Sequence, residues 1–356
     1  MIPTGIEILK SLLEERETKQ EKTKLIKRIA DDLTLAQGTV KRWLDLEDVP
    51  VQYQFDMMRL SGMDIDYSNF TAKQKDQFFT PRESAAYCVE KSINILSSLG
   101  ENIDDLIFIE PSAGDGSFLH HLPSNQTIAM DIDPKSDSIH RKDFLTFNPD
   151  NKSDKSIVLI GNPPFGLRGN LALRFMNHAS TFADYICFIL PQLFESDGKG
   201  SPRKRVNGLN LYHTENLKTD FYDPSGRSIP VKVIFQVWSK KHINKKLLIS
   251  GEKSDKVRVY SLSLGNSPSQ IRNKDMIGKC DAYLPSTCYG ETNMRAYSSF
   301  EDLPGRKGYG IVLLESDKVE LKKKVFELNW AEKAFLSTNS ALNLRTSMIN
   351  EVIDNI

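Results

Sequence analysis

Short apolar runs alternate with longer mixed segments between residues 79 and 240, and this alternation constrains the fold more than any other feature of the sequence. Each run is rich in β-branched and aromatic side chains and has turn-forming residues near its ends. Such runs, separated by helix-length intervals, are typical of strands in a parallel sheet covered on both faces. They occupy residues 106–109, 127–130, 157–160, 185–190 and 231–238. We therefore predict a doubly wound α/β domain.

The length of 356 residues predicts about two or three compact units. We place a helical domain at 1–65, the α/β domain at 66–245 and a third unit at 246–356, with a polar linker at 63–78. The third unit is polar and irregular before a helical stretch at 331–353. For this unit we predict a C-terminal α+β region with a target-recognition or accessory role.

Residues 5–62 show the apolar periodicity of amphipathic helices, with almost no strand signal. The spacing over 26–44 is that of a helix-turn-helix: Ala30 is small where two helices would cross, and Val40 and Trp43 would pack the second helix. This pattern favours nucleic-acid binding, while a helical domain that docks on a protein partner stays open. The side chains free to face a groove or phosphates are Gln37, Thr39, Lys41 and Arg42.

Composition narrows the classes of protein. Hydrophobic residues make up 39% of the chain and charged residues 26%, as in globular domains. No apolar run approaches the roughly 20 residues of a membrane helix. The first residues lack the basic and apolar parts of a signal peptide, so we expect an intracellular protein of the cytoplasm, nucleoid or nucleus. The four cysteines lack paired short spacing, which indicates neither a disulfide framework nor a metal site.

The first apolar run leads into a loop with two closely spaced glycines, Gly114 and Gly116. A strand followed by a tight glycine turn lets backbone N–H groups approach a ligand at the carboxyl edge of a sheet. The second run ends at Asp131, where doubly wound folds place an acid that accepts hydrogen bonds from ribose hydroxyls. A third element combines the carboxylate of Asp143, which can accept from an amino group, with the ring of Phe144, which can lie on a flat base.

The run at 157–160 leads into Gly161-Asn162-Pro163-Pro164-Phe165-Gly166, the most informative stretch of the chain. Two consecutive prolines fix the backbone and present rigid carbonyl oxygens. Beside them stand the side-chain oxygen of Asn162 and the ring of Phe165, on which a base can stack. Asn-Pro and Pro-Pro also form ordinary turns. The position at the carboxyl end of a buried strand favours a ligand site instead.

Together these segments resemble the N6-adenine members of the S-adenosylmethionine (SAM)-dependent methyltransferases in their gamma motif order, over roughly residues 75–240. The resemblance implies a Rossmann-like methyltransferase domain with SAM as cofactor. The implied catalytic residues, which match an (Asp/Asn/Ser)-Pro-Pro-(Tyr/Phe/Trp) signature, are Asn162, Pro163, Pro164 and Phe165. The implied cofactor-binding residues are Phe79, Thr80, Pro81, Glu110, Pro111, Ser112, Ala113, Gly114, Gly116, Asp131, Ile132, Asp143 and Phe144.

Within that set the resemblance implies distinct roles. The Phe-x-Thr-Pro-like segment at 78–81 would contact the methionine end of SAM, Asp131 would hold the ribose, and Asp143 would bind the adenine of the cofactor. A target base inside a duplex must be flipped out, with Phe165 as one stacking wall. We expect a second aromatic wall before the run at 231–238, from Phe221 or Tyr222.

The resemblance implies methyl transfer to the N6 amino group of adenine in DNA. The alternatives are the same reaction on RNA and a non-catalytic nucleic-acid-binding relative. The helix-turn-helix pattern favours DNA. Residues 1–62 contain none of the implied catalytic or cofactor-binding residues, so we expect a chain that starts near Asp66 to bind the cofactor normally.

Overall fold

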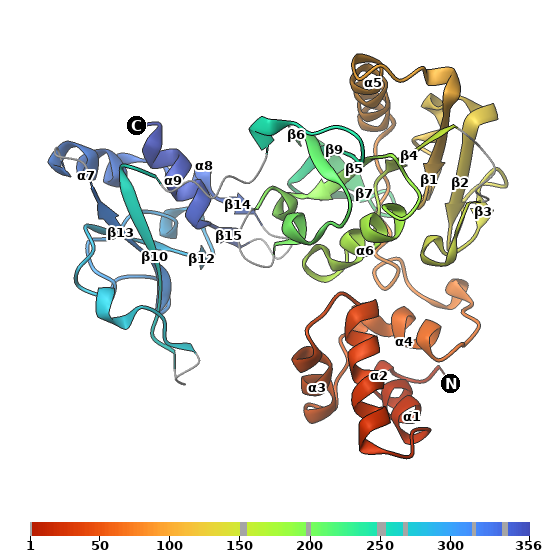
Figure 1. Ribbon diagram of the computed structural model, residues 1–356, viewed down its shortest axis with the longest axis horizontal. Coiled ribbons are helices and arrows are strands. Elements are labelled where there is room, and N and C mark those ends of the chain that lie inside the picture. Colours follow the sequence, from red (N-terminus) through yellow and green to blue (C-terminus); the bar gives the residue numbers. More distant parts are fainter. Residues whose placement is uncertain are drawn as a thin grey trace.

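The computed structural model describes residues 2–149, 155–196, 201–247, 254–265, 270–314, 318–336 and 341–356. Figure 1 shows a helical module at the N-terminus, a central sheet with its helices, and a C-terminal unit beside that sheet. Within the described ranges, no helix is both long and apolar enough to cross a membrane.

The N-terminal module consists of short helices, two of which begin at reciprocal caps. Before α1 and α2 a threonine accepts from the backbone of a glutamate at the third helical position, whose carboxylate accepts from the threonine in return: Thr4 with Glu7, and Thr18 with Glu21. These caps satisfy N–H groups that have no partner inside a helix. The helices are α1 (Gly5–Glu14), α2 (Lys19–Asp32), α3 (Gln37–Asp45) and α4 (Gln54–Leu60).

Helices α2 and α3 pack against each other, and the residues that the predicted spacing singled out are buried, while the helix-turn-helix itself stays a prediction. Ala30 and Val40 have no exposed surface, and Trp43 is 6% exposed. The core of the module also includes Phe70, which lies beyond the predicted boundary at residue 65. The module therefore takes up part of the segment that we predicted to be a linker.

The central sheet has the strand order β3-β2-β1-β4-β5-β9-β6, and each of the five predicted strands is present. The prediction of an all-parallel sheet is wrong at one edge, where β9 runs antiparallel to both β5 and β6. β6 was missed because its sequence, NLYHTENL, is mostly polar and half-buried. The strands are β1 (Leu106–Glu110), β2 (Thr127–Asp131), β3 (His140–Arg141), β4 (Ser156–Gly161), β5 (Tyr185–Pro191), β6 (Asn210–Leu217) and β9 (Val233–Ser239).

Two helices cover opposite faces of this sheet. α5 (Arg82–Ser98) packs on one face through residues such as Cys88 and Leu96, and α6 (Asn170–Ala179) packs on the other through Leu173 and Met176. The described parts of the intervals that follow β1 and β2 contain 3₁₀ turns in place of the expected helices. The carboxyl ends of β1, β2 and β4 meet at one edge, so the loops that follow them lie together.

The C-terminal unit is an α+β region, as predicted. Its antiparallel sheet has the order β10-β13-β11, and α9 packs against β10. The predicted helical stretch at 331–353 is wrong, because β14 and β15 interrupt it, and residues 337–340 lie outside the described ranges. The elements are β10 (Val257–Ser263), β11 (Ala282–Pro285), β12 (Thr287–Cys288), β13 (Lys307–Leu313), α7 (Lys318–Glu327), α8 (Trp330–Lys333), β14 (Phe335–Leu336), β15 (Leu342–Asn343) and α9 (Thr346–Asp354).

Candidate active site

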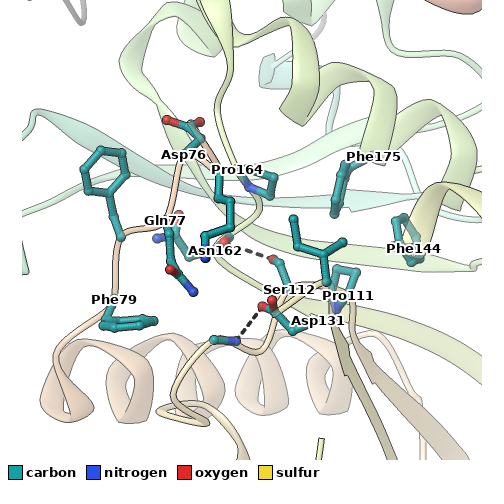
Figure 2. Close-up of a pocket in the computed structure, with 14 residues that line it drawn as sticks. Asp76, Gln77, Phe79, Pro111, Ser112, Asp131, Phe144, Asn162, Pro164 and Phe175 are labelled. Carbon is teal, nitrogen blue, oxygen red and sulfur yellow. Dashed lines mark hydrogen bonds between the residues drawn. The ribbon is translucent and has the colours of Figure 1, made fainter. Parts of the chain in front are cut away.

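A pocket lies at the edge where β1, β2 and β4 end, and residues of the loops that follow these strands line it. In Figure 2 Asn162 and Asp131 lie around one space, with Phe79 on one side and Phe144 and Phe175 on the other. The predicted residues that line the pocket are Phe79, Pro111, Ser112, Gly114, Asp131, Ile132, Phe144, Asn162 and Pro164.

The loop after β1 is held against the end of β2 by the carboxylate of Asp131. The Gly114 N–H donates to Asp131 Oδ2 at 2.8 Å, and the Asp133 N–H donates to Asp131 Oδ1 at 2.7 Å. Gly114 has φ of 54°, and a Cβ there would lie 3.0 Å from the Phe79 ring. A side chain at position 114 would therefore be strained in its backbone and crowded by Phe79.

Phe79 is fixed over this loop by a short pairing with a distant strand. The hairpin of β7 (Asp220–Tyr222) and β8 (Ser228–Pro230) supplies Tyr222. The Phe79 N–H donates to the Tyr222 carbonyl at 2.8 Å, and the Tyr222 N–H donates back at 3.1 Å. Thr80 and Pro81 lead into α5 and are not among the residues that line the pocket.

A buried carboxyl group, that of Glu110, ends β1 beside the loop. Glu110 is 1% exposed, and within the described ranges its Oε2 has no hydrogen-bond partner. Burial, and then the neighbouring charges of Asp131 and Asp115, raise the pKa of Glu110 well above its usual range. Burial also raises the pKa of Asp131. Both shifts favour the neutral, protonated carboxyl group.

The loop after β4 presents an open acceptor to the same pocket. Its backbone is tied to the loop after β1, because the Ser112 hydroxyl donates to the Asn162 carbonyl at 3.1 Å. The side-chain Oδ1 of Asn162 is buried and, in the part of the chain that the structure describes, accepts no hydrogen bond. Within this loop Pro163 is buried, and Pro164 lines the pocket. A ligand donor at this position would satisfy Asn162.

The two candidates for the second aromatic wall are packed against residues of the pocket loops. Phe221 is 2% exposed and packs edge-on against Phe165, with the ring centroids 6.5 Å apart. Its ring is therefore covered in this structure, and the role of Phe221 or Tyr222 as a stacking wall stays a prediction. Tyr222 is half-buried, and its hydroxyl donates to Asp115 in the loop after β1. Phe221 thus contacts the loop after β4, and Tyr222 contacts the loop after β1.

Asp143 lies outside the pocket lining and is engaged by the helical module. Its Oδ2 lies 2.6 Å from Nε of Arg59 on α4, and its Oδ1 accepts from the Leu145 N–H at 3.0 Å. Its neighbour Phe144 is 1% exposed and packs 5.0 Å from the ring of Phe175. The role of Asp143 in binding the cofactor's adenine stays a prediction.

Several residues of the pocket were missed by the sequence analysis, because they lie in the predicted linker or in the middle of α6. The turn at 71–77 that brings most of them to the site has a detectable signal, a threonine followed three residues later by a glutamine. The missed residues are Lys75, Asp76, Gln77 and Phe175, while Phe78 belongs to the segment 78–81 that the resemblance implied.

The predicted nucleic-acid contacts on α3 are accessible. Lys41 and Arg42 are exposed, while Gln37 and Thr39 are half-buried. None of them lines the pocket. Their contact with nucleic acid stays a prediction.

No known family profile and no curated protein sequence matches the chain. Among solved structures it is similar to a protein of Pyrococcus horikoshii provisionally assigned as an RNA methyltransferase, with 17% identity, a TM-score of 0.34, and coverage of 47% of this chain and 87% of that chain. It is also similar to the 23S rRNA methyltransferase ErmE, with 17% identity, a TM-score of 0.33, and coverage of 49% and 72%.

A further similar structure is the magnesium protoporphyrin IX methyltransferase of Synechocystis PCC 6803, solved with bound SAM. The identity is 15%, the TM-score is 0.32, and the match covers 52% of this chain and 91% of that chain. At such low identities and TM-scores, the activities of these proteins do not transfer to this chain.

Proposed function

We propose that the protein is a SAM-dependent methyltransferase that modifies the N6 amino group of adenine in nucleic acid. The observation that carries this proposal is the buried Oδ1 of Asn162, an acceptor with no partner among the described residues. A buried acceptor of this kind is costly unless a ligand supplies a donor. The exocyclic amino group of adenine is a donor of the required type.

The residues opposite Asn162 fit SAM, which carries a positive charge. Asp131 lines the pocket beside the loop after β1, and the absence of a side chain at Gly114 lets Phe79 lie close to that loop. Asp131 would accept from the ribose hydroxyls with lone pairs left over from its two backbone contacts. Phe79 would contact the methionine end. When bound, SAM supplies an activated methyl group.

The loop after β4 would act by positioning and by charge complementarity. Asn162 Oδ1 and the Pro163 carbonyl would each accept a hydrogen bond from the target amino group, which draws its nitrogen towards a tetrahedral state with a free lone pair. That nitrogen forms the new bond to the methyl carbon as the carbon–sulfur bond breaks, and it then releases a proton to water. The leaving thioether is neutral, so no strong base is needed.

DNA is the favoured substrate because the spacing over α2 and α3 is that of a helix-turn-helix, whose second helix would enter a major groove. Phe165 is half-buried and would stack on a flipped adenine. RNA is the alternative substrate, since a small helical domain also binds structured RNA by shape.

The test is transfer of labelled methyl groups from SAM to duplex DNA, single-stranded DNA and total RNA in parallel, followed by nucleoside analysis. We expect N6-methyladenine from DNA. Asn162→Ala should reduce kcat by about 10²–10³-fold, because it removes an acceptor that acts on developing charge. SAM affinity should stay within a few-fold, since Asn162 faces the target. Product from RNA alone would select the alternative substrate, and SAM binding without any product would indicate a non-catalytic relative.

A further inference from the structure

Asp76 joins the segment before Phe79 to the loop that carries Asn162. Its Oδ2 accepts from the Gly166 N–H at 2.7 Å, although the two residues are 90 positions apart in the chain. Gly166 stands two positions after Pro164, and Pro163 and Pro164 have no N–H to offer. Figure 2 shows Asp76 beside Pro164.

The local sequence fixes the position of Asp76. Thr71 and Gln74 cap one helical turn reciprocally, at 2.9 and 3.3 Å. The turn closes where the Gln77 N–H donates to the Ala72 carbonyl at 2.9 Å. Asp76 has φ of 51°, the left-handed conformation in which a helical turn often ends. Glycine and asparagine adopt this conformation more readily than other residues, so both are tolerable replacements at this position.

The same loop is held from its other side by α6. The Phe165 carbonyl accepts from the N–H groups of Leu171 at 3.2 Å and Ala172 at 3.3 Å, in the first turn of the helix. The loop is thus bound at the Gly166 N–H by Asp76 and at the Phe165 carbonyl by α6. This arrangement fixes the direction of the chain directly after the two prolines, and with it the Phe165 ring and the Pro163 carbonyl.

We infer that Asp76 is a positioning residue that clamps the Asn162–Phe165 loop in its reactive geometry. The inference rests on the proposed function, in which this loop binds the target amino group. Gln77, Phe78 and Phe79 follow Asp76 directly and line the same pocket. The clamp therefore sets the loop in register with the side of the pocket that would bind SAM.

The experiment compares Asp76→Gly with Asp76→Asn in the full chain. The glycine variant keeps the left-handed backbone without strain and removes the acceptor, whereas the asparagine variant keeps one acceptor oxygen. Asn273→Gly is the matched control, because Asn273 also has positive φ, at 43°, and a side chain that donates to a backbone carbonyl, that of Ser261. It lies in the C-terminal unit.

For Asp76→Gly we expect kcat to fall by about tenfold to a hundredfold, since displacing reacting groups by 1 Å costs about 10²-fold. SAM affinity should stay within about threefold, and Asp76→Asn should recover most of kcat because it retains an acceptor. Asn273→Gly should behave as wild type. An unchanged kcat in Asp76→Gly, an equal loss in Asp76→Asn, or a loss of SAM affinity as large as the loss of kcat would overturn the inference.

Hydrogen–deuterium exchange separates this inference from the proposed function. The amide of Gly166 should exchange faster in Asp76→Gly than in wild type, whether or not the protein methylates anything. If wild type binds SAM but methylates no nucleic acid, and the Gly166 amide is still deprotected in the variant, the proposed function is wrong and the clamp stands. Unchanged protection would remove the clamp and leave the function standing.

Discussion

The two units that flank the central sheet are attached to it in different ways. The helical module contributes buried charges: Arg59 pairs with Asp143, and Asp56 pairs with Arg174 at 2.7 Å. The C-terminal unit packs two hydrophobic clusters built only from residues 257–356. It meets the central domain where β14 lies beside the short turn at Gln192–Glu195. Figure 1 shows the helical module on the α6 side of the sheet.

This difference shows that the helical module contacts and supports the elements that form the pocket. The Asn170 amide at the start of α6 donates to the Leu33 carbonyl at 3.1 Å and to the Thr34 hydroxyl at 2.8 Å. Arg205 donates to the Thr34 carbonyl. The turn of the helix-turn-helix therefore rests on the helix that follows the Asn162 loop. These contacts argue against our expectation that a chain starting near Asp66 binds the cofactor normally.

Removing each flanking unit should give the largest contrast. A chain that begins at Asp66 leaves Asp143 and Arg174 without their partners, and breaking one buried pair costs about 3–5 kcal/mol of unfolding free energy. We expect this chain to lose measurable SAM binding in calorimetry and to unfold at lower temperature. A chain that ends at Leu247 should keep SAM affinity within a few-fold. Equal SAM affinity of the two shortened chains would remove the distinction between the flanking units.

Asp131→Ala measures how much SAM affinity depends on a single side chain that lines the pocket. Charge-assisted hydrogen bonds contribute about 1.5–3 kcal/mol each, so loss of one ribose contact should weaken SAM binding by roughly tenfold to a hundredfold. Turnover at saturating SAM should change less, because Asp131 would hold the cofactor and not the target. Calorimetry with SAM and steady-state kinetics separate the two effects. An unchanged affinity would place the ribose contact elsewhere.

We predicted the pocket residues that follow a buried strand. We missed those that reach the pocket through contacts between segments far apart in the sequence. Asn162 and Gly114 directly follow apolar strands, so their place at the sheet edge is given by periodicity and by the meeting of parallel strand ends. The contact of Asp76 with Gly166 and that of Arg59 with Asp143 depend on how separate segments dock, which no local pattern encodes. The segment 63–78 was predicted to be a linker because many of its residues are polar, although residues 71–77 form a structured turn.

The strands of the central sheet divide in the same way, into those predicted from a local pattern and those that depend on long-range pairing. The buried strands were found because each is a continuous apolar run. The antiparallel direction of β9 and the presence of β6 depend on strand pairing across the sheet, and half-buried strands carry a weak apolar signal. The burial of Phe221 was not predicted, because residue type and position do not say which side of a strand is covered.

Arg59→Ala tests the attachment of the helical module with a single side chain. It removes an ion pair from Asp143, which is half-buried and keeps its contacts with the Leu145 N–H and the Tyr67 hydroxyl, so the free energy of unfolding should fall by about 1–3 kcal/mol. SAM affinity should fall only a few-fold, less than for Asp131→Ala, since Arg59 acts through Asp143 and Phe144. The matched control is Arg295→Ala in the C-terminal unit, where an exposed arginine lies 5.0 Å from the Tyr297 ring. Its loss should cost no more than about 1 kcal/mol and leave SAM affinity unchanged. Denaturant unfolding and calorimetry measure both variants, and equal stability of the two would show that the buried pair does not secure the module.

The smallest effect on SAM binding, and the sharpest test of the module's outer face, should come from replacing Lys41 and Arg42 on α3 with alanine. Both are exposed and lie away from the pocket lining, so SAM affinity should not change. If they meet phosphates, nucleic-acid binding should weaken across all sequences, and the log–log salt dependence should flatten by about two units of slope, one for each charge removed. If Gln37 and Thr39 contact bases, replacing them should change sequence preference instead. Fluorescence anisotropy over a range of salt concentrations measures these effects on the same duplex and RNA probes. An unaltered salt slope, with full activity at limiting substrate, would assign the exposed face of α3 to a protein partner. The helical module would then have two roles, since one side would support the pocket and the other would bind a protein.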